Sequence, residues 1–134
     1  MKRAKVMERS KKQLKASGIA YDDQGRYLAM HISGMLCFLT PYSGYLEFSA
    51  AYPACLKGGN SEENKAFLFD LTEGILCGKF EIKESSSKIY PAFQVTVPAE
   101  LIDKPKKLRK IIAIVLSTAS SCKKNIGEIL ETDD

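Results

Sequence analysis

The chain has a single histidine, His31, so any Ser-His-Asp triad or histidine-ligated metal would have to use it. Neither a Gly-x-Ser-x-Gly elbow nor a His-Glu-x-x-His motif accompanies it. Strand alternation instead places His31 on the outer face of a predicted sheet, opposite its neighbours Met30 and Ile32. We therefore expect a surface histidine without a catalytic role.

Two pairs of adjacent carboxylates, Asp22-Asp23 and Glu62-Glu63, could serve acid/base chemistry or a metal ion. Both pairs fall where acids are favoured for local reasons, the first in a turn and the second at a helix start. The segment 58–61 precedes the same helix and could offer backbone N–H groups to an anion, but it lacks the lysine of a phosphate loop. The sequence predicts no catalytic residue, no metal ligand and no cofactor site, and hence no enzyme.

The four cysteines, Cys37, Cys55, Cys77 and Cys122, lack the paired C-x-x-C spacing of a zinc site. Cys37 lies in the apolar run 35–39, where a thiol packs as a small hydrophobic group. The basic amino terminus has no apolar stretch behind it, and no run approaches the length that crosses a bilayer. We expect reduced, structural cysteines in a cytoplasmic protein.

Positive charge is concentrated at the amino terminus. Residues 1–15 hold seven bases and one acid, a net +6, whereas the whole chain carries +4, so the remainder carries −2. The seven bases are Lys2, Arg3, Lys5, Arg9, Lys11, Lys12 and Lys15. Such an arm could contact phosphates or an acidic partner, although no aromatic residue is interleaved on which bases could stack. A solvated helix face is the alternative interpretation.

Hydrophobic periodicity predicts one α+β domain over residues 1–134. We expect an antiparallel meander sheet of about five strands packed by helices, in the order α-β-β-β-β-α-β-β-α, with the first strand short. The predicted helices cover 2–17, 60–76 with Asn60 as N-cap, and 103–130 with Asp103 as N-cap. The predicted strands cover 19–23, 26–32, 35–39, 45–52, 79–84 and 88–97, and an acidic mobile tail follows at 131–134.

Alternation also predicts which side chains face the core. Leu46, Phe48 and Ala50 should point inward, and the continuously apolar run 35–39 should be covered on both faces. Pro91 indicates an edge strand or a bulge. The last helix should bury an apolar series that advances by steps of four and three: Leu108, Ile112, Val115, Ala119, Cys122, Ile126 and Ile129. The middle helix should be covered from more than one direction, because Phe69 and Leu76 flank its main apolar face. The first helix has only a thin stripe of apolar residues, which predicts shallow docking on the core.

Three tyrosines stand out from this pattern. The alternation that sends Leu46, Phe93 and their neighbours inward sends Tyr27, Tyr45 and Tyr90 outward, on the face that also holds His31. Tyrosine supplies a large amphipathic contact area at a low cost in side-chain entropy, as suits a protein interface. Packing on a strand is the alternative reason for tyrosine at such positions.

The chain resembles the YbjN-like family, whose fold is shared with type III secretion chaperones. The resemblance covers nearly the whole chain and rests on three segments: the meander GRYLAMHISGMLCFLTPYSGYLEFSAAYP, the helix and hairpin NKAFLFDLTEGILCGKFEIKESSSKIYPAFQVTV, and the closing helix KLRKIIAIVLSTASSCKKNIGEIL. It implies a one-sided antiparallel sheet packed by helices, frequent dimerisation and protein binding. It implies no catalytic residue.

These observations favour a non-enzymatic module, a homodimer that binds a protein or peptide segment. Tyr27, His31, Tyr45 and Tyr90 are the candidate contact residues, and pairing with a sheet edge is one available mode. Two alternatives remain: a nucleic-acid-associated regulator that uses the basic arm, and a small-ligand domain with a pocket between helix and sheet.

Overall fold

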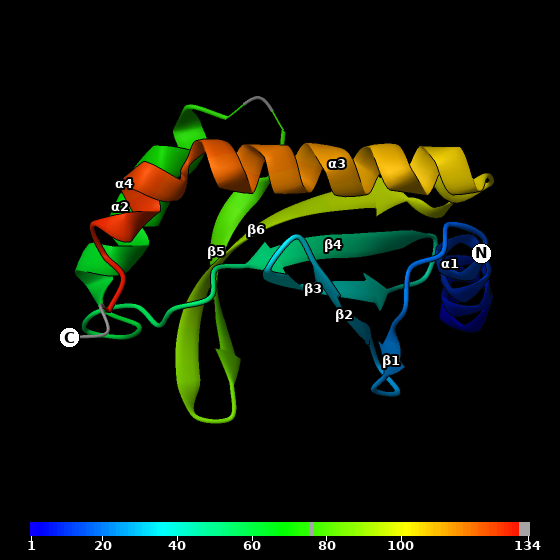
Figure 1. Ribbon diagram of the computed structural model, residues 1–134, viewed down its shortest axis with the longest axis horizontal. Coiled ribbons are helices and arrows are strands. Elements are labelled where there is room, and N and C mark those ends of the chain that lie inside the picture. The colour runs from blue at the N-terminus through cyan, green and yellow to red at the C-terminus, as the bar shows by residue number, and fades with distance from the viewer. Residues whose placement is uncertain (76, 132–134) are drawn as a thin grey trace.

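The computed structural model describes residues 1–75 and 77–131, apart from the side chain at position 85. The described residues form one antiparallel sheet of six strands, in the order β1-β2-β3-β4-β6-β5 (Figure 1). The strands are β1 Asp22–Asp23, β2 Leu28–Ile32, β3 Met35–Pro41, β4 Tyr45–Ala51, β5 Lys79–Ser85 and β6 Lys88–Pro98. The helices are α1 Arg3–Ala16, α2 Glu62–Glu73, the 3-10 helix η1 Ala99–Ile102, α3 Pro105–Ser121 and α4 Lys123–Gly127. The predicted element order and fold class are confirmed.

The core lies between one face of the sheet and the helices α1 and α3 (Figure 1). Register aligns the inward positions of neighbouring strands: Leu39 pairs with Phe48, and Phe48 pairs with Val95. Leu46, Phe48 and Ala50 are fully buried, as predicted. The buried series on the last helix is also confirmed from Leu108 to Ile126, with a break in the helix at Cys122.

Helix α1 docks more deeply than predicted. Val6 and Leu14 are fully buried, and the polar residues Ser10 and Gln13 between them are buried as well. The Gln13 side-chain amide donates a hydrogen bond to the Ile102 carbonyl at 3.0 Å, so a buried polar group is satisfied by η1. The prediction of shallow docking did not include this contact, because it counted only apolar residues and took the polar side chains of this helix to face solvent.

Two predicted helix caps are wrong by one residue. Ser61, and not Asn60, caps α2, and its hydroxyl accepts a hydrogen bond from the Asn64 amide at 3.1 Å. Lys104 occupies the N-cap position of α3 without a side-chain cap, while Asp103 forms an ion pair with Lys107 at 2.9 Å. The geometry of the preceding loop decides which of two neighbouring residues caps a helix, and the local sequence does not specify that geometry.

The middle helix is covered on one side only. Leu68 is 3% exposed, whereas Phe69 is 64% exposed, so the expected cover over Phe69 is absent among the described residues. Helix α2 ends at Glu73, earlier than predicted, and Leu76 lies outside the described residues.

Strand β6 is not an edge strand, because it lies between β4 and β5. The predicted edge is present locally, since Pro91 lies beyond the last β4–β6 pair and has a strand partner only in β5. The Pro91 carbonyl accepts a hydrogen bond from the Tyr52 amide at 3.0 Å. The proline nitrogen points to the same side as this carbonyl, just beyond Ala51 and Ala92, the last β4–β6 pair. The missing N–H therefore falls where the β4–β6 pairing ends.

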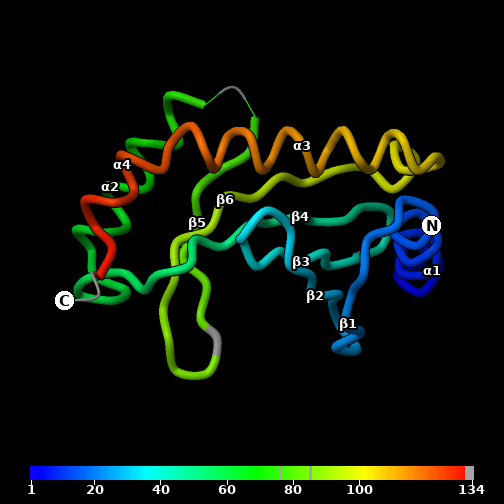
Figure 2. The backbone as a smooth tube through the Cα atoms, in the orientation of Figure 1, coloured from blue at the N-terminus to red at the C-terminus, as the bar shows by residue number. Residues whose placement is uncertain are grey.

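The carboxyl-terminal segment returns beside the loop that follows β4 (Figure 2). The Glu131 amide donates to the Cys55 carbonyl at 2.8 Å, and Leu130 forms an isolated bridge with Leu56. The predicted mobile tail at 131–134 therefore begins at a residue with a backbone partner, and its last three residues lie outside the described residues.

Candidate functional site

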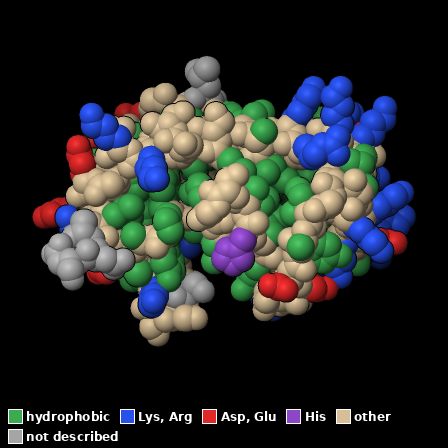
Figure 3. All heavy atoms as spheres, viewed as in Figure 1, with side chains coloured by type: hydrophobic (Ala, Val, Ile, Leu, Met, Phe, Trp, Pro, Cys, Tyr) green, Lys and Arg blue, Asp and Glu red, His purple; other side chains and the backbone are tan. Residues whose placement is uncertain are grey.

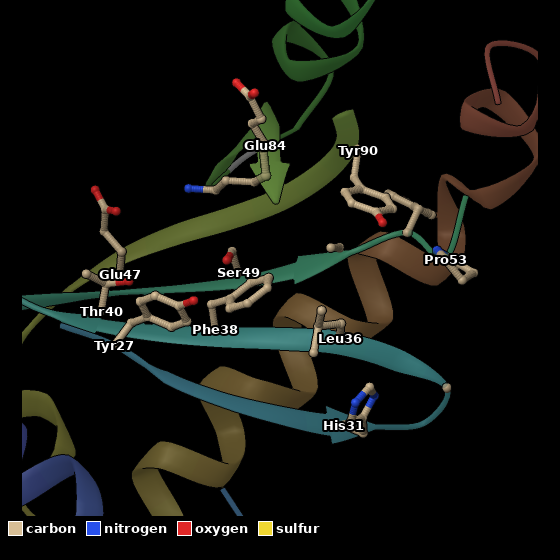
Figure 4. A pocket seen from close by; sticks show the side chains of 14 residues that line it. Tyr27, His31, Leu36, Phe38, Thr40, Glu47, Ser49, Pro53, Glu84 and Tyr90 are labelled. Carbon is tan, nitrogen blue, oxygen red and sulfur yellow. The ribbon is translucent and has the colours of Figure 1, made fainter. Parts of the chain in front are cut away.

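The face of the sheet opposite α1 and α3 carries a groove, and we call it the open-face groove (Figure 4). Its volume is about 400 Å³. The groove crosses β2, β3 and β4, and the hairpin of β5 and β6 forms one wall. Its lining residues are Tyr27, His31, Gly34, Leu36, Phe38, Thr40, Glu47, Ser49, Ala51, Tyr52, Pro53, Lys83, Glu84 and Tyr90.

The floor of the groove is apolar. Strand β3 alternates Leu36 and Phe38 onto this face while Cys37 and Leu39 point into the core. The Tyr27 ring meets the Phe38 ring edge-on, with centroids 5.6 Å apart and an interplanar angle of 73°. Leu36 and Phe38 are only half-buried, which leaves aromatic and aliphatic surface available to a ligand.

The positions of Leu36 and Phe38 show that one prediction about β3 is wrong. The apolar run 35–39 was expected to be covered on both faces, yet one of its faces is the floor of this groove. A continuously apolar strand is typical of double burial, but it also suits a binding surface. Alternation alone cannot separate these two cases.

Charged groups of both signs stand at the rim. Lys83 pairs with Glu81 at 3.4 Å, and Glu81 also pairs with Lys79 at 2.7 Å. Burial opposes ionisation of Glu81, but these two lysines together hold the pKa of its carboxyl below the ordinary value. Glu47, on β4, accepts a hydrogen bond from the Tyr42 hydroxyl at 3.3 Å.

The structure brings three of the four predicted contact residues together. Tyr27, His31 and Tyr90 all line the groove: Tyr27 directly precedes β2, His31 lies in β2 and Tyr90 lies in β6, and Figure 4 shows them around the floor. Tyr45 is exposed but lies outside the lining, stacked on Tyr42 with centroids 4.8 Å apart. The groove therefore contains most of the predicted surface, together with Leu36 and Phe38, which the sequence interpretation assigned to the core.

Three of the seven basic residues of the predicted arm have partners within the fold. The Arg3 guanidinium donates to the Arg26 carbonyl at 2.6 Å, the Arg9 guanidinium donates to the Ala99 carbonyl at 3.2 Å, and Lys11 pairs with Asp23 at 2.6 Å. The other four, Lys2, Lys5, Lys12 and Lys15, are exposed. The segment is an ordered helix docked on the core.

Within residues 1–75 and 77–131, no three His, Cys, Asp or Glu side chains gather in a way that could hold a metal ion. None of the described helices combines the length and apolar character needed to cross a bilayer. The four cysteines are free thiols, and burial raises the pKa of the Cys37 thiol to about 12. Cys37 is therefore protonated at neutral pH and unsuited to act as a nucleophile.

Comparisons with known proteins show the fold. No family model matches the chain, and no curated protein matches it by sequence. The solved structure of YbjN from E. coli, described as a candidate transcription regulator, superposes with a TM-score of 0.71 at 11% sequence identity. The match covers 94% of this chain and 96% of that one. The chain thus shares the YbjN fold over nearly its whole length, as the three quoted segments predicted.

Proposed function

We propose that the protein is a non-enzymatic module that binds an extended protein or peptide segment in the open-face groove. The observation that carries the proposal is the apolar floor of Leu36 and Phe38, which are only half-buried on the sheet face opposite α1 and α3. Peptide-binding surfaces combine such apolar anchors with a polar rim that excludes water and fixes orientation. Tyr27 and Tyr90 supply aromatic walls, and Lys83, Glu47 and Glu84 supply the rim.

The shape and chemistry of the groove favour a peptide over a small molecule. The lining comes from five strands and remains open to solvent, whereas small-ligand sites enclose most of their ligand. Charges of both signs at the rim suit the alternating side chains of an extended segment. Four free thiols are compatible with a reducing compartment, so the proposal is for a cytoplasmic protein. The E. coli protein of the same fold is described as a candidate regulator, and capture of a protein segment is one way in which a regulator acts.

Selection from a random peptide library displayed on phage would test the proposal. Peptides recovered on the native protein should carry aromatic or aliphatic residues at alternate positions and should lose at least tenfold in affinity for Leu36→Lys. Ile114→Lys is the matched control, because Ile114 is 50% exposed on α3, on the other side of the sheet. The proposal fails if the selected peptides bind Leu36→Lys as tightly as they bind the native protein.

We also propose that two copies associate through the free edge of β5. The Phe80 amide donates to the Thr72 hydroxyl at 2.9 Å and so points away from β6. By alternation, the amides and carbonyls of Ile82 and Glu84 point outward as well. Beyond the Phe80–Thr72 bond, this edge has no strand partner among the described residues, and such an edge is a template for another strand.

The sequence of β5 is complementary to itself. Antiparallel pairing about a two-fold axis at Ile82 sets Ile82 against its own copy and Glu81 against the partner's Lys83. The exposed ring of Phe69 lines the adjoining groove between α2 and this edge, and association would shield it. Apolar and charge pairing therefore agree on one register.

Light scattering tests this part of the proposal. The expected mass is twice the 14.9 kDa of the chain. Glu84→Pro should give a monomer with an unchanged fold, because it removes an outward amide and leaves the β5–β6 ladder intact. A native protein that stays monomeric at high concentration, or a Glu84→Pro variant that stays dimeric, would reject the β5 interface without affecting the groove.

A further inference from the structure

The fold assembles two basic segments that are far apart in the sequence into one surface. Helix α1 contacts both η1 and α3, so the amino terminus lies beside the start of α3. Figure 3 shows Lys and Arg side chains gathered over this end of the molecule. We call it the two-helix basic surface, and its exposed members are Lys2, Lys5, Lys12, Lys15, Lys104, Lys106, Lys107, Arg109 and Lys110.

The charge of this end is large for a protein of this size. Residues 1–15 carry a net +6, and residues 99–110 carry a net +3, from five bases and two acids. Since the whole chain carries +4, the remaining residues carry −5. The protein is therefore strongly polarised, with its positive charge at one end, and such a distribution attracts and orients polyanions.

A groove of about 550 Å³ joins the two segments. Lys5, Arg9 and Lys12 of α1 line it on one side and Asp103 lines it on the other. Glu8 also contributes to the lining, so the groove contains two acids. Asp103 is paired with Lys107, and this pair lowers the pKa of its carboxyl, so its negative charge is offset locally.

The positions of the bases on α3 are unfavourable for the helix itself. Lys106, Lys107, Arg109 and Lys110 occupy its first turns, and no acid occupies the first turn. The helix dipole disfavours positive charge there. An external anion would offset this repulsion. Arg3, Arg9, Lys11 and Lys107 have partners within the fold. The other bases of the two segments are exposed: Lys2, Lys5, Lys12 and Lys15 at the amino terminus, and Lys104, Lys106, Arg109 and Lys110 near the start of α3.

We propose that the two-helix basic surface binds the phosphate backbone of a nucleic-acid duplex. Neither residues 1–16 nor residues 99–110 contain an aromatic side chain, so this surface cannot stack on unpaired bases. Contacts to phosphates alone position a protein on a duplex without reading its sequence. The inference is independent of the open-face groove, which lies on a different part of the molecule.

Fluorescence anisotropy with a labelled 20-base-pair DNA duplex of mixed sequence tests the proposal. With about four phosphate contacts, affinity should fall roughly 100-fold between 50 and 200 mM salt. Lys5→Glu with Lys12→Glu, and separately Lys106→Glu with Lys110→Glu, should each weaken binding at least tenfold at 50 mM salt. The matched control is Lys123→Glu with Lys124→Glu, which makes the same change in net charge at exposed positions of α4, and it should stay within about threefold of the native protein.

Three results would overturn the proposal. The first is no binding to the duplex at 50 mM salt. The second is an equal loss in the control variant, since net charge and not location would then explain the binding. The third is loss in only one of the two helix variants, since the surface would then not be joined. Vesicles with 30% anionic lipid provide the comparison: binding to them without binding to the duplex would assign the surface to a membrane.

Discussion

Removal of the Tyr52 hydroxyl should destabilise the protein through a single buried hydrogen bond. Tyr52 follows β4, is 3% exposed, and donates to the Ala119 carbonyl of α3 at 2.6 Å. Tyr52→Phe keeps the ring, so no large cavity forms, but it removes the donor between the sheet and the helix. A buried hydrogen bond of this type contributes about 1–2 kcal/mol once the unpaired carbonyl is counted. We expect the free energy of unfolding to fall by about 1.5 kcal/mol, which corresponds to roughly 5 °C in Tm.

The control is Tyr42→Phe, which also removes one phenol hydroxyl. Tyr42 is only half-buried, and its bond to Glu47 is longer, at 3.3 Å. Its loss should cost less than about 0.5 kcal/mol, in the range of ordinary surface substitutions. Urea unfolding monitored by circular dichroism, with unchanged m-values, would measure both variants. Equal losses for the two variants, or none for Tyr52→Phe, would refute the role assigned to the bond.

The same residue predicts an alkaline effect. Burial, followed by the nearby Cys122 thiol, raises the pKa of Tyr52 above its ordinary value of 10.0. The unfolded chain loses this phenol proton near pH 10, whereas the folded chain retains it, so the stability from Tyr52 falls as pH rises above 10. The limiting slope is about 1.4 kcal/mol per pH unit. In Tyr52→Phe the fall in unfolding free energy between pH 10 and 11 should be smaller than in the native protein, and an identical fall would contradict the shift.

Three further predictions concern positions where the fold leaves little freedom. Gly78→Ala should lower the free energy of unfolding in urea by at least about 2 kcal/mol, because a Cβ at φ +86° would lie 2.5 Å from the Phe93 ring and 2.6 Å from the Gln94 carbonyl. The control Gly44→Ala, at φ +81° with nothing within 4 Å of the added Cβ, should lower it by only about 1 kcal/mol, and equal losses would contradict the steric argument. Cys37→Ala should flatten the loss of stability between pH 9 and about 12, since the unfolded thiol ionises near 9 and burial holds the folded pKa at about 12; an unchanged pH profile would contradict this shift. Asn64→Ala should lower the free energy of unfolding by about 1–2 kcal/mol and speed backbone amide exchange in residues 57–61, because the Asn64 side-chain amide donates to the carbonyls of Lys57 and Gly59 at 2.7 and 2.8 Å. Unchanged exchange would show that another contact holds the loop.

The arrangement of strands and helices could be predicted because local rules agreed with one another. Alternation placed Leu46, Phe48 and Ala50 correctly, and helical spacing placed the buried series from Leu108 to Ile126. Each of these signals depends on side-chain direction within one element, and sequence reports that directly.

Features that depend on contacts between distant segments could not be predicted in this way. The predictions of cover over Phe69 and of shallow docking by α1 were wrong, and the position of β6 inside the sheet was not predicted from Pro91. Each depends on a neighbour far away in sequence: Gln13 is buried because the Ile102 carbonyl accepts from it, and Pro91 is tolerated because β4 has already ended.

Only part of the candidate site could be predicted from the sequence. Tyr27 and His31 belong to the predicted strand 26–32 and Tyr90 to the predicted strand 88–97; alternation assigned them to one face, where the structure places them around one groove. Leu36 and Phe38 were assigned to the core because a strand with apolar side chains on both faces is normally buried on both. The face that holds Leu36 and Phe38 is open because α1 and α3 both pack on the opposite side of the sheet, and alternation within one strand does not report where the helices pack.

Chemical-shift mapping with a peptide selected from the library would locate the peptide on the protein surface. With ¹⁵N-labelled protein, we expect peptide addition to shift the amide signals of Leu36, Phe38, Ser49 and Tyr90, while those of exposed α3 residues such as Ile114 remain in place. Shifts confined to α3 or to α1, with the four groove signals unchanged, would contradict the proposed binding in the groove.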